Sequence, residues 1–114
     1  MVAGIEVIPV AALARPGASP ALEGVEHGGL GVSLILVDVA PGRGPSLHRH
    51  EHHEIFVVQE ATATFTDGQE QREVGRGAIV VVRAAHPHAF TNTGAGRLRQ
   101  VAIHVSDAFE TTWL

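Results

Sequence analysis

Four of the eight histidines of this 114-residue chain fall within positions 48–53. Glu51 and Glu54 stand among and just after them, and His86 and His88 follow further along the chain. Imidazole nitrogens and carboxylate oxygens are the ligands that divalent transition metals take from a protein when no thiolate is present. The density of these side chains therefore predicts a metal site.

The spacing of the cluster predicts which residues face the ion. Residues two apart in a strand point to the same side, so His48 and His50 can aim at one point. Glu54 has the same parity, and His88 could complete the set from a distant strand. Three imidazoles and one carboxylate suit Fe, Mn, Ni or Zn, and leave open positions for substrate, dioxygen or water, as catalysis requires. A register that uses His52 does not place a carboxylate correctly.

Composition narrows the classes of function. The chain has no cysteine, which excludes disulfides and zinc fingers. Its net charge of −4, with eight arginines and no lysine, offers no basic face, so we expect no nucleic-acid partner. The apolar run at residues 7–14 contains Pro9 and is too short to span a bilayer, so we expect no membrane association and a cytoplasmic protein.

The elements that must position the cluster are short strands. No stretch shows a convincing helical period, and apolar, β-branched runs alternate with Gly/Pro turns, which predicts an all-β sandwich or barrel in a single domain spanning residues 1–114. The tail, residues 106–114, is expected to form a short helix capped by Ser106 or an extended arm. The expected strands are residues 4–8, 22–26, 31–40, 55–59, 61–66, 69–74, 78–82, 88–91 and 98–105.

Two stretches resemble the motifs of the cupin family. The first motif spans residues 42–61, where Ala61 replaces its last glycine. The second spans residues 77–92, where Arg83 replaces a proline and Ala85 a glycine. The residues that fit the motifs are Gly42, His48, His50, Glu54, Gly77, His88 and Asn92.

The resemblance implies a double-stranded β-helix, or jelly-roll barrel, with one divalent transition metal (Fe, Mn, Ni or Zn) inside the barrel mouth. Its implied ligands are the four positions of the motifs, His48, His50, Glu54 and His88. The cupin fold hosts many chemistries, so fold alone does not settle function.

We expect a metal-dependent enzyme acting on a small organic molecule. A dioxygenase-like reaction ranks first, an isomerase or lyase next, and a non-catalytic small-molecule binding or sensing protein is the alternative. His86 or Glu51 would handle protons. We also expect a homodimer, formed through the first strand or through the tail that carries Trp113 and Leu114.

Several side chains near the cluster have two readings. His52 and His53 are expected in an exposed turn. Arg83 could hold a substrate carboxylate but is more readily a surface residue. One row of strand 98–105 must face the interior. We expect the apolar row (Val101, Ile103, Val105), which leaves His104 without a role; the polar row would make Gln100 and His104 substrate contacts.

Overall fold

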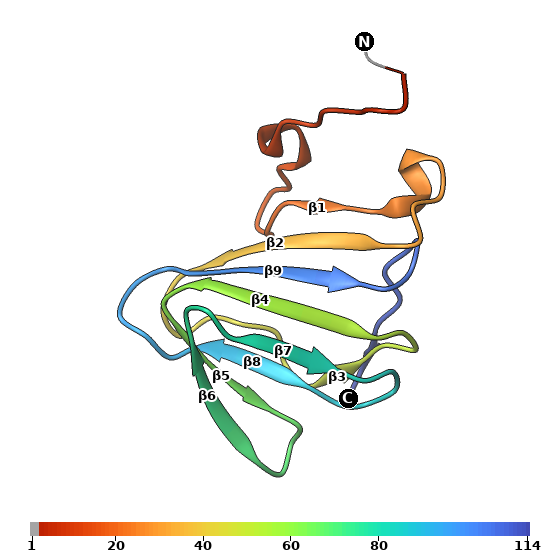
Figure 1. The fold of residues 1–114 in the computed structure, drawn as a ribbon. Coiled ribbons are helices and arrows are strands. Elements are labelled where there is room, and N and C mark those ends of the chain that lie inside the picture. The colour runs from red at the N-terminus through yellow and green to blue at the C-terminus, as the bar shows by residue number, and fades with distance from the viewer. Residues whose placement is uncertain (1–2) are drawn as a thin grey trace.

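The computed structural model describes residues 3–114 as a protein built almost wholly of β-strands (Figure 1). This confirms the all-β class. Within these residues no helix is long and apolar enough to cross a membrane. Two 3₁₀-helices, η1 (Val10–Leu13) and η2 (Gly24–His27), accompany the strands β1 (Ala21–Leu22), β2 (Ser33–Val39), β3 (His48–Arg49), β4 (Glu54–Glu60), β5 (Thr62–Thr66), β6 (Gln71–Gly75), β7 (Ile79–Val82), β8 (Ala89–Asn92), β9 (Leu98–His104) and β10 (Thr112–Trp113).

The strands form three antiparallel sheets. The largest has the order β1-β2-β9-β4-β7, a second has the order β6-β5-β8, and β10 pairs with β3. The Asp67-Gly68 turn joins β5 to β6 as a hairpin, with the Asp67 carboxylate accepting the N–H groups of Gln69 and Glu70 at 2.8 Å. Strands that follow one another along the chain are therefore divided between two main sheets.

The core lies on the inner faces of these sheets. Phe56 on β4 meets Phe65 on β5 and Phe90 on β8, with ring centroids 5.0–5.6 Å apart. The edge-to-face and tilted contacts of these rings are the favoured aromatic geometries. Phe90 therefore packs in the core. The histidine cluster lies at one end of this core, where the ring centroids of His88 and Phe56 are 6.3 Å apart.

The N-terminal end of the chain differs from the prediction, and at the C-terminal end the extended arm is observed instead of the short helix. Residues 4–8 form no strand, since no strand of the described residues lies beside them to supply hydrogen bonds. Of the predicted second strand, residues 22–26, only Leu22 lies in a strand (β1), and Gly24–His27 form η2 instead. The tail forms no helix: Trp113 pairs with His48, and the Leu114 N–H donates to the Leu47 carbonyl at 3.1 Å. So short a helix is marginal without packing, and pairing with β3 satisfies the backbone instead.

The predicted inner face of β9 is wrong. The polar row is the buried one, with Gln100 and Ala102 1% and His104 2% exposed, while Val101 and Ile103 face outward. The reason is register. His104 lies opposite Glu54, and Ala102 opposite Phe56, so this row must share the inner face of β4.

Candidate metal centre

Antiparallel pairing brings the four motif residues together. His48 and His88 form a bridge in which each N–H donates to the other's carbonyl, at 3.0 and 2.8 Å. Glu54, at the start of β4, lies opposite His104 on β9. His50 follows β3 directly, between these two pairings. The cluster therefore depends on strand pairs that are distant in sequence.

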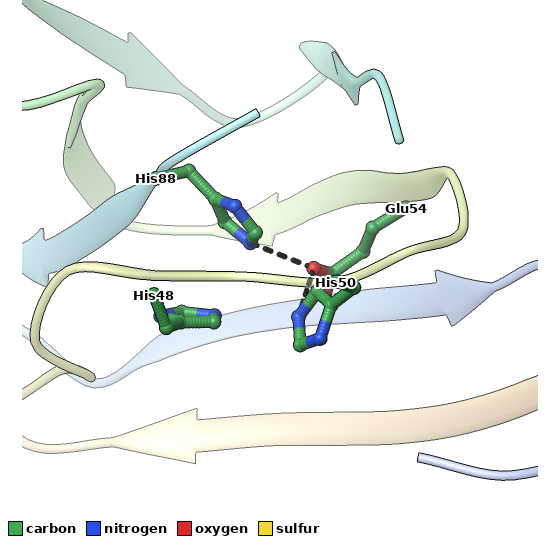
Figure 2. A group of neighbouring side chains, drawn as sticks. All are labelled: His48, His50, Glu54 and His88. Carbon is green, nitrogen blue, oxygen red and sulfur yellow. Dashed lines mark hydrogen bonds and ion pairs between the residues drawn. The ribbon is translucent and has the colours of Figure 1, made fainter. Parts of the chain in front are cut away.

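The four predicted side chains His48, His50, Glu54 and His88 are buried, at 3–6% exposure, and their ligand atoms lie within 4.8 Å of one another (Figure 2). Glu54 is central. Its Oε1 lies 2.9 Å from His88 Nε2 and 3.2 Å from His50 Nε2. The arrangement is a buried histidine–carboxylate group that could bind a metal.

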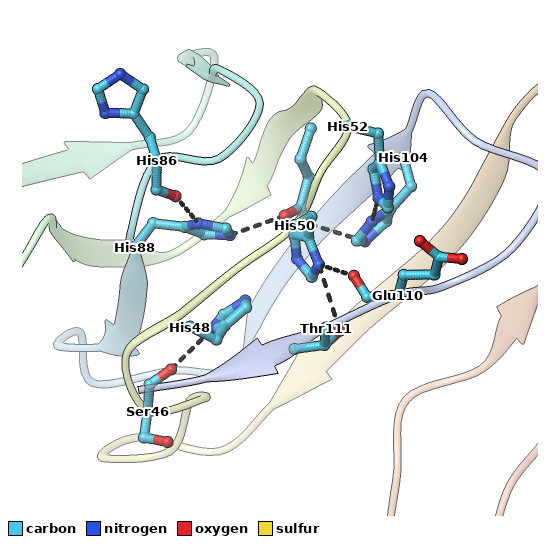
Figure 3. A network of polar contacts seen from close by, with 10 residues as sticks. Ser46, His48, His50, His52, His86, His88, His104, Glu110 and Thr111 are labelled. Atoms are coloured by element: carbon cyan, nitrogen blue, oxygen red, sulfur yellow. Dashed lines mark hydrogen bonds and ion pairs between the residues drawn. The ribbon is translucent and has the colours of Figure 1, made fainter.

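The backbone orients the imidazole rings (Figure 3). Nδ1 of His48 donates to the Ser46 carbonyl at 2.7 Å, and Nδ1 of His50 to the Glu110 carbonyl at 2.8 Å. His88 Nδ1 meets the His86 carbonyl at 3.2 Å. Such contacts select the tautomer that leaves Nε2 free as a ligand.

Two buried nitrogens test whether the site fits a metal. His50 Nε2 and His104 Nε2 lie 3.2 and 3.0 Å from the Glu54 oxygens, yet neither has a hydrogen-bond partner with acceptable geometry. The rings approach the carboxylate without aiming an N–H at it. Buried polar atoms are rarely left unpaired, and an ion among these donors would satisfy them. The residues present therefore fit a divalent metal.

His104 is the residue that the sequence prediction missed. Its Nε2 lies 3.0 Å from Glu54 Oε2, and its Nδ1 is 2.8 Å from His52 Nε2. His50, His52 and His104 form a second group of close ligand atoms. The signal for His104 was its parity with Gln100 and Ala102. Gln100 is buried too, but it does not line the cavity described below.

Neighbouring charges and burial shift the pKa values of Glu54 and His50 in opposite directions. Burial would raise the pKa of Glu54, but contacts from His104, His50 and His88 hold that pKa well below its usual range. Burial lowers the pKa of His48. In His50 burial also acts to lower the pKa, but Glu54 and the Glu110 carbonyl outweigh it, so the pKa is raised. Glu54 is therefore held as a carboxylate.

The cluster opens into a cavity of about 580 Å³. His48, His50, Glu54 and His104 line one part of it, and the other lining residues lie in the η1–β1 loop, on β2, β4, β8 and β9, in the 43–45 turn and in the tail. This volume lies in the range of pockets that hold small organic ligands.

The two residues predicted to handle protons lie outside this cavity. Glu51 is exposed and 3.9 Å from Arg49. His86 is exposed and, with Arg83, lines a separate pocket of about 380 Å³. The structure does not bring either proton-transfer candidate to the cavity. His53 is exposed as expected, and its Nδ1 accepts the Ala84 N–H at 2.9 Å.

Comparison with known structures supports the same fold. A protein from Klebsiella pneumoniae with a double-stranded β-helix domain is 16% identical, with a TM-score of 0.77, 96% of this chain covered and 92% of that one. Oxalate decarboxylase from Bacillus subtilis is 22% identical, with a TM-score of 0.72 over 82% of this chain. An oxalate oxidase is 23% identical, with a TM-score of 0.77 over 98% of this chain.

The chain spans 27% of the decarboxylase chain and 66% of the oxidase chain. At these identities the likenesses show the double-stranded β-helix fold alone. Among curated proteins none matches the chain. The family model of the cupin domain matches residues 35–104, which is more than half of the sequence. The protein belongs to the cupin domain family.

Proposed function

We propose that residues 1–114 act as a single cupin domain that is a metal-dependent enzyme on a small organic molecule, with a dioxygenase-like reaction first. One divalent transition metal (Fe, Mn, Ni or Zn) would be held by His48, His50, Glu54 and His88. The observation that carries this proposal is a buried cluster of these ligands that opens to a cavity and in which the Nε2 atoms of His50 and of the neighbouring His104 are unpaired. When bound, the metal would supply Lewis-acid or redox chemistry to substrate and dioxygen, the oxidant.

The chain's own residues would bind substrate and hold a proton. Glu54 stays ionised beside three imidazoles, so it supplies the one negative charge of the ligand set. His104 contacts Glu54 and His52, and His52 is only half-buried. This chain of contacts leads from the cluster toward solvent. It makes His52 and His104 better placed than His86 or Glu51 to hold or move a proton.

We also propose a homodimer formed through the outer face of the five-stranded sheet. Two cross-strand rows of apolar residues cover this face, and Ile79 and Val81 remain 66% and 49% exposed. A contiguous apolar patch bordered by polar residues is typical of the centre of a protein interface. The rows are Leu34-Ile103-Ile55-Val81 and Leu36-Val101-Val57-Ile79.

A second copy is the occupant that suits this face. Strands lie about 4.8 Å apart and residues along a strand about 3.4 Å apart, so the two rows cover roughly 250 Å². A stable interface buries about 800 Å² on each partner, and the rows would form the apolar centre of such an interface. The polar rim beside it carries both charges, with Arg99 between Asp38 and Glu60 at 3.8 and 3.9 Å. A two-fold axis between two copies would place the positive and negative groups of one rim opposite those of the other.

The metal is the first test of the enzyme proposal. Protein purified without an affinity tag should contain about one equivalent of a transition metal. His48→Ala and His88→Ala should lose it, whereas His104→Ala should bind about 10–100-fold more weakly, as neighbours of ligands do. His27→Ala is the matched control, because His27 pairs with Glu6 away from the cluster. A wild type that binds no metal after loading refutes the proposal.

Reaction class is tested on the metal-loaded protein. We expect dioxygen uptake with one member of a panel of phenols, thiols and diketones, lost in His48→Ala. Turnover without dioxygen uptake would favour an isomerase or lyase. Ligand binding without any turnover would favour a non-catalytic binding protein.

A further inference from the structure

The cavity walls carry an unusual balance of charge. Among the described residues that line it, Glu54 is the only one with a carboxylate, whereas Arg15 and Arg43 are both present. A divalent ion less the Glu54 charge leaves one positive charge, and the two guanidinium groups add two more. The chain as a whole has a net charge of −4. Positive charge is therefore concentrated where a ligand would enter.

Neither arginine of the cavity wall is neutralised by a carboxylate of the described residues. The Arg15 guanidinium donates through Nε and Nη2 to the Ser19 carbonyl at 2.8 and 2.6 Å. The Arg43 backbone is fixed by its N–H to the Ala40 carbonyl, and its own carbonyl accepts the Asn92 N–H. Within residues 3–114 neither guanidinium has a carboxylate within 4.0 Å. Their charge remains available to a ligand.

The glycine next to Arg43 helps to fix this turn. A Cβ at Gly44 would overlap the Phe90 carbonyl oxygen, so the turn packs its backbone directly on β8. Only glycine permits so close an approach. The backbone of Arg43 is therefore held in a rigid turn beside the cavity, and its side chain is exposed.

The remaining wall is apolar. β2 contributes one side of the cavity, and aromatic rings from β8 and the tail contribute another. The Trp113 ring lies 5.0 Å from that of His48, and the Phe109 ring 4.9 Å from that of His104. A ligand that fills this volume must cover apolar surface as well as meet positive charge. The larger apolar side chains of this wall include Ile35, Val37, Val39, Phe90, Phe109 and Trp113.

We infer that the substrate class is an organic anion with an apolar or aromatic body, such as an aryl-substituted carboxylate, and that Arg43 and Arg15 select its charge. This inference rests on the proposed function, because it assigns a substrate to the same site. Cationic ligands are disfavoured by the arginines, and neutral ligands leave them without a partner. A very small acid would leave the apolar wall exposed to water.

Trp113 provides the readout, since it is the only tryptophan of the chain and lines the cavity. Its fluorescence would be titrated with phenylacetate, with neutral phenylacetamide, and with acetate, which lacks the apolar body. Phenylacetate should bind at least about tenfold more tightly than either of the other two. Equal affinity for the acid and its amide overturns the inference, as does the absence of phenylacetate binding.

Variants assign the preference to the arginines. Arg43→Met should weaken phenylacetate binding about fivefold, as expected for an exposed charge, and leave phenylacetamide unchanged. Arg43→Lys should retain part of the affinity, and the double variant with Arg15→Met should lose the preference for the acid. Arg76→Met is the control, since Arg76 is exposed in the β6–β7 turn and does not line the cavity. An unchanged preference in the double variant overturns the inference.

The titrations are run on metal-free and on Zn(II)-loaded protein, with zinc content measured for every variant. If the protein takes up neither zinc nor iron, manganese or nickel on loading, the proposed metal enzyme fails. The arginine-dependent preference for the acid is then still decided in the metal-free protein. If zinc binds normally but the arginine variants behave as wild type, only the inference about substrate fails.

Discussion

At the scale of single residues, Glu54 and His50 set how protons and metal compete. In the metal-free protein the Glu54 carboxylate raises the pKa of His50 above its usual value of 6.5. A metal must displace that proton to bind at Nε2. The site is therefore sensitive to acid over a range that begins above the usual titration of histidine.

This coupling predicts the pH dependence of metal binding. As the pH falls from about 8.5 to 5.5, the affinity should fall, beginning above pH 6.5, because the raised pKa of His50 lets it gain its proton there. Glu54→Gln removes the anion that raises the pKa of His50, so its weaker binding should begin to fall at a lower pH. Chelator competition measures both curves. An affinity that does not change with pH would contradict histidine ligation.

At the scale of elements, two turns carry alanine where the cupin motifs have glycine. Ala61, between β4 and β5, and Ala85, after β7, both have positive φ angles, of 68° and 67°. A side chain in this left-handed region costs about 1–2 kcal/mol, partly offset by the greater chain entropy that glycine loses on folding. At both motif glycine positions the backbone therefore keeps its left-handed conformation, although this chain carries alanine there.

Glycine at these turns should stabilise the fold. Ala61→Gly and Ala85→Gly are each expected to raise the free energy of unfolding by about 0.5–1 kcal/mol, since strain is relieved without loss of a core contact. Ala95→Gly, in an exposed loop without a positive φ, should be neutral or destabilising. Urea unfolding of the metal-free proteins tests the comparison. Destabilisation by the first two changes would show that the turns are not strained.

At the scale of the whole molecule, the outer apolar face predicts association. Val57 and Val101 lie opposite each other at its centre, so Val57→Glu or Val101→Glu should convert a dimer to a monomer by burying unpaired charge. Thr91→Glu, exposed on β8 of the other sheet, is the control. Sedimentation at micromolar concentration measures the change. A wild type that is monomeric there would refute the proposed dimer.

Much of the site followed from local pattern. The alternation of His48 and His50 and the parity of Glu54 were readable because strand geometry repeats every two residues, whereas the position of His88 came from the resemblance to the second cupin motif. The strand class followed equally from β-branched runs between turns. These features depend on near neighbours, so sequence by itself determined the fold class, the cupin resemblance and the four candidate ligands.

Tertiary structure decided what depends on pairing. Which face of β9 is buried depends on its register between β2 and β4, and that register made His104 part of the cluster. The tail became a strand because β3 offered it hydrogen-bond partners, which placed the Glu110 carbonyl against His50. Arg15 and Arg43 likewise line one cavity only because the folded chain brings their segments together. No local pattern carries these long-range contacts, because they exist only once the sheets have formed.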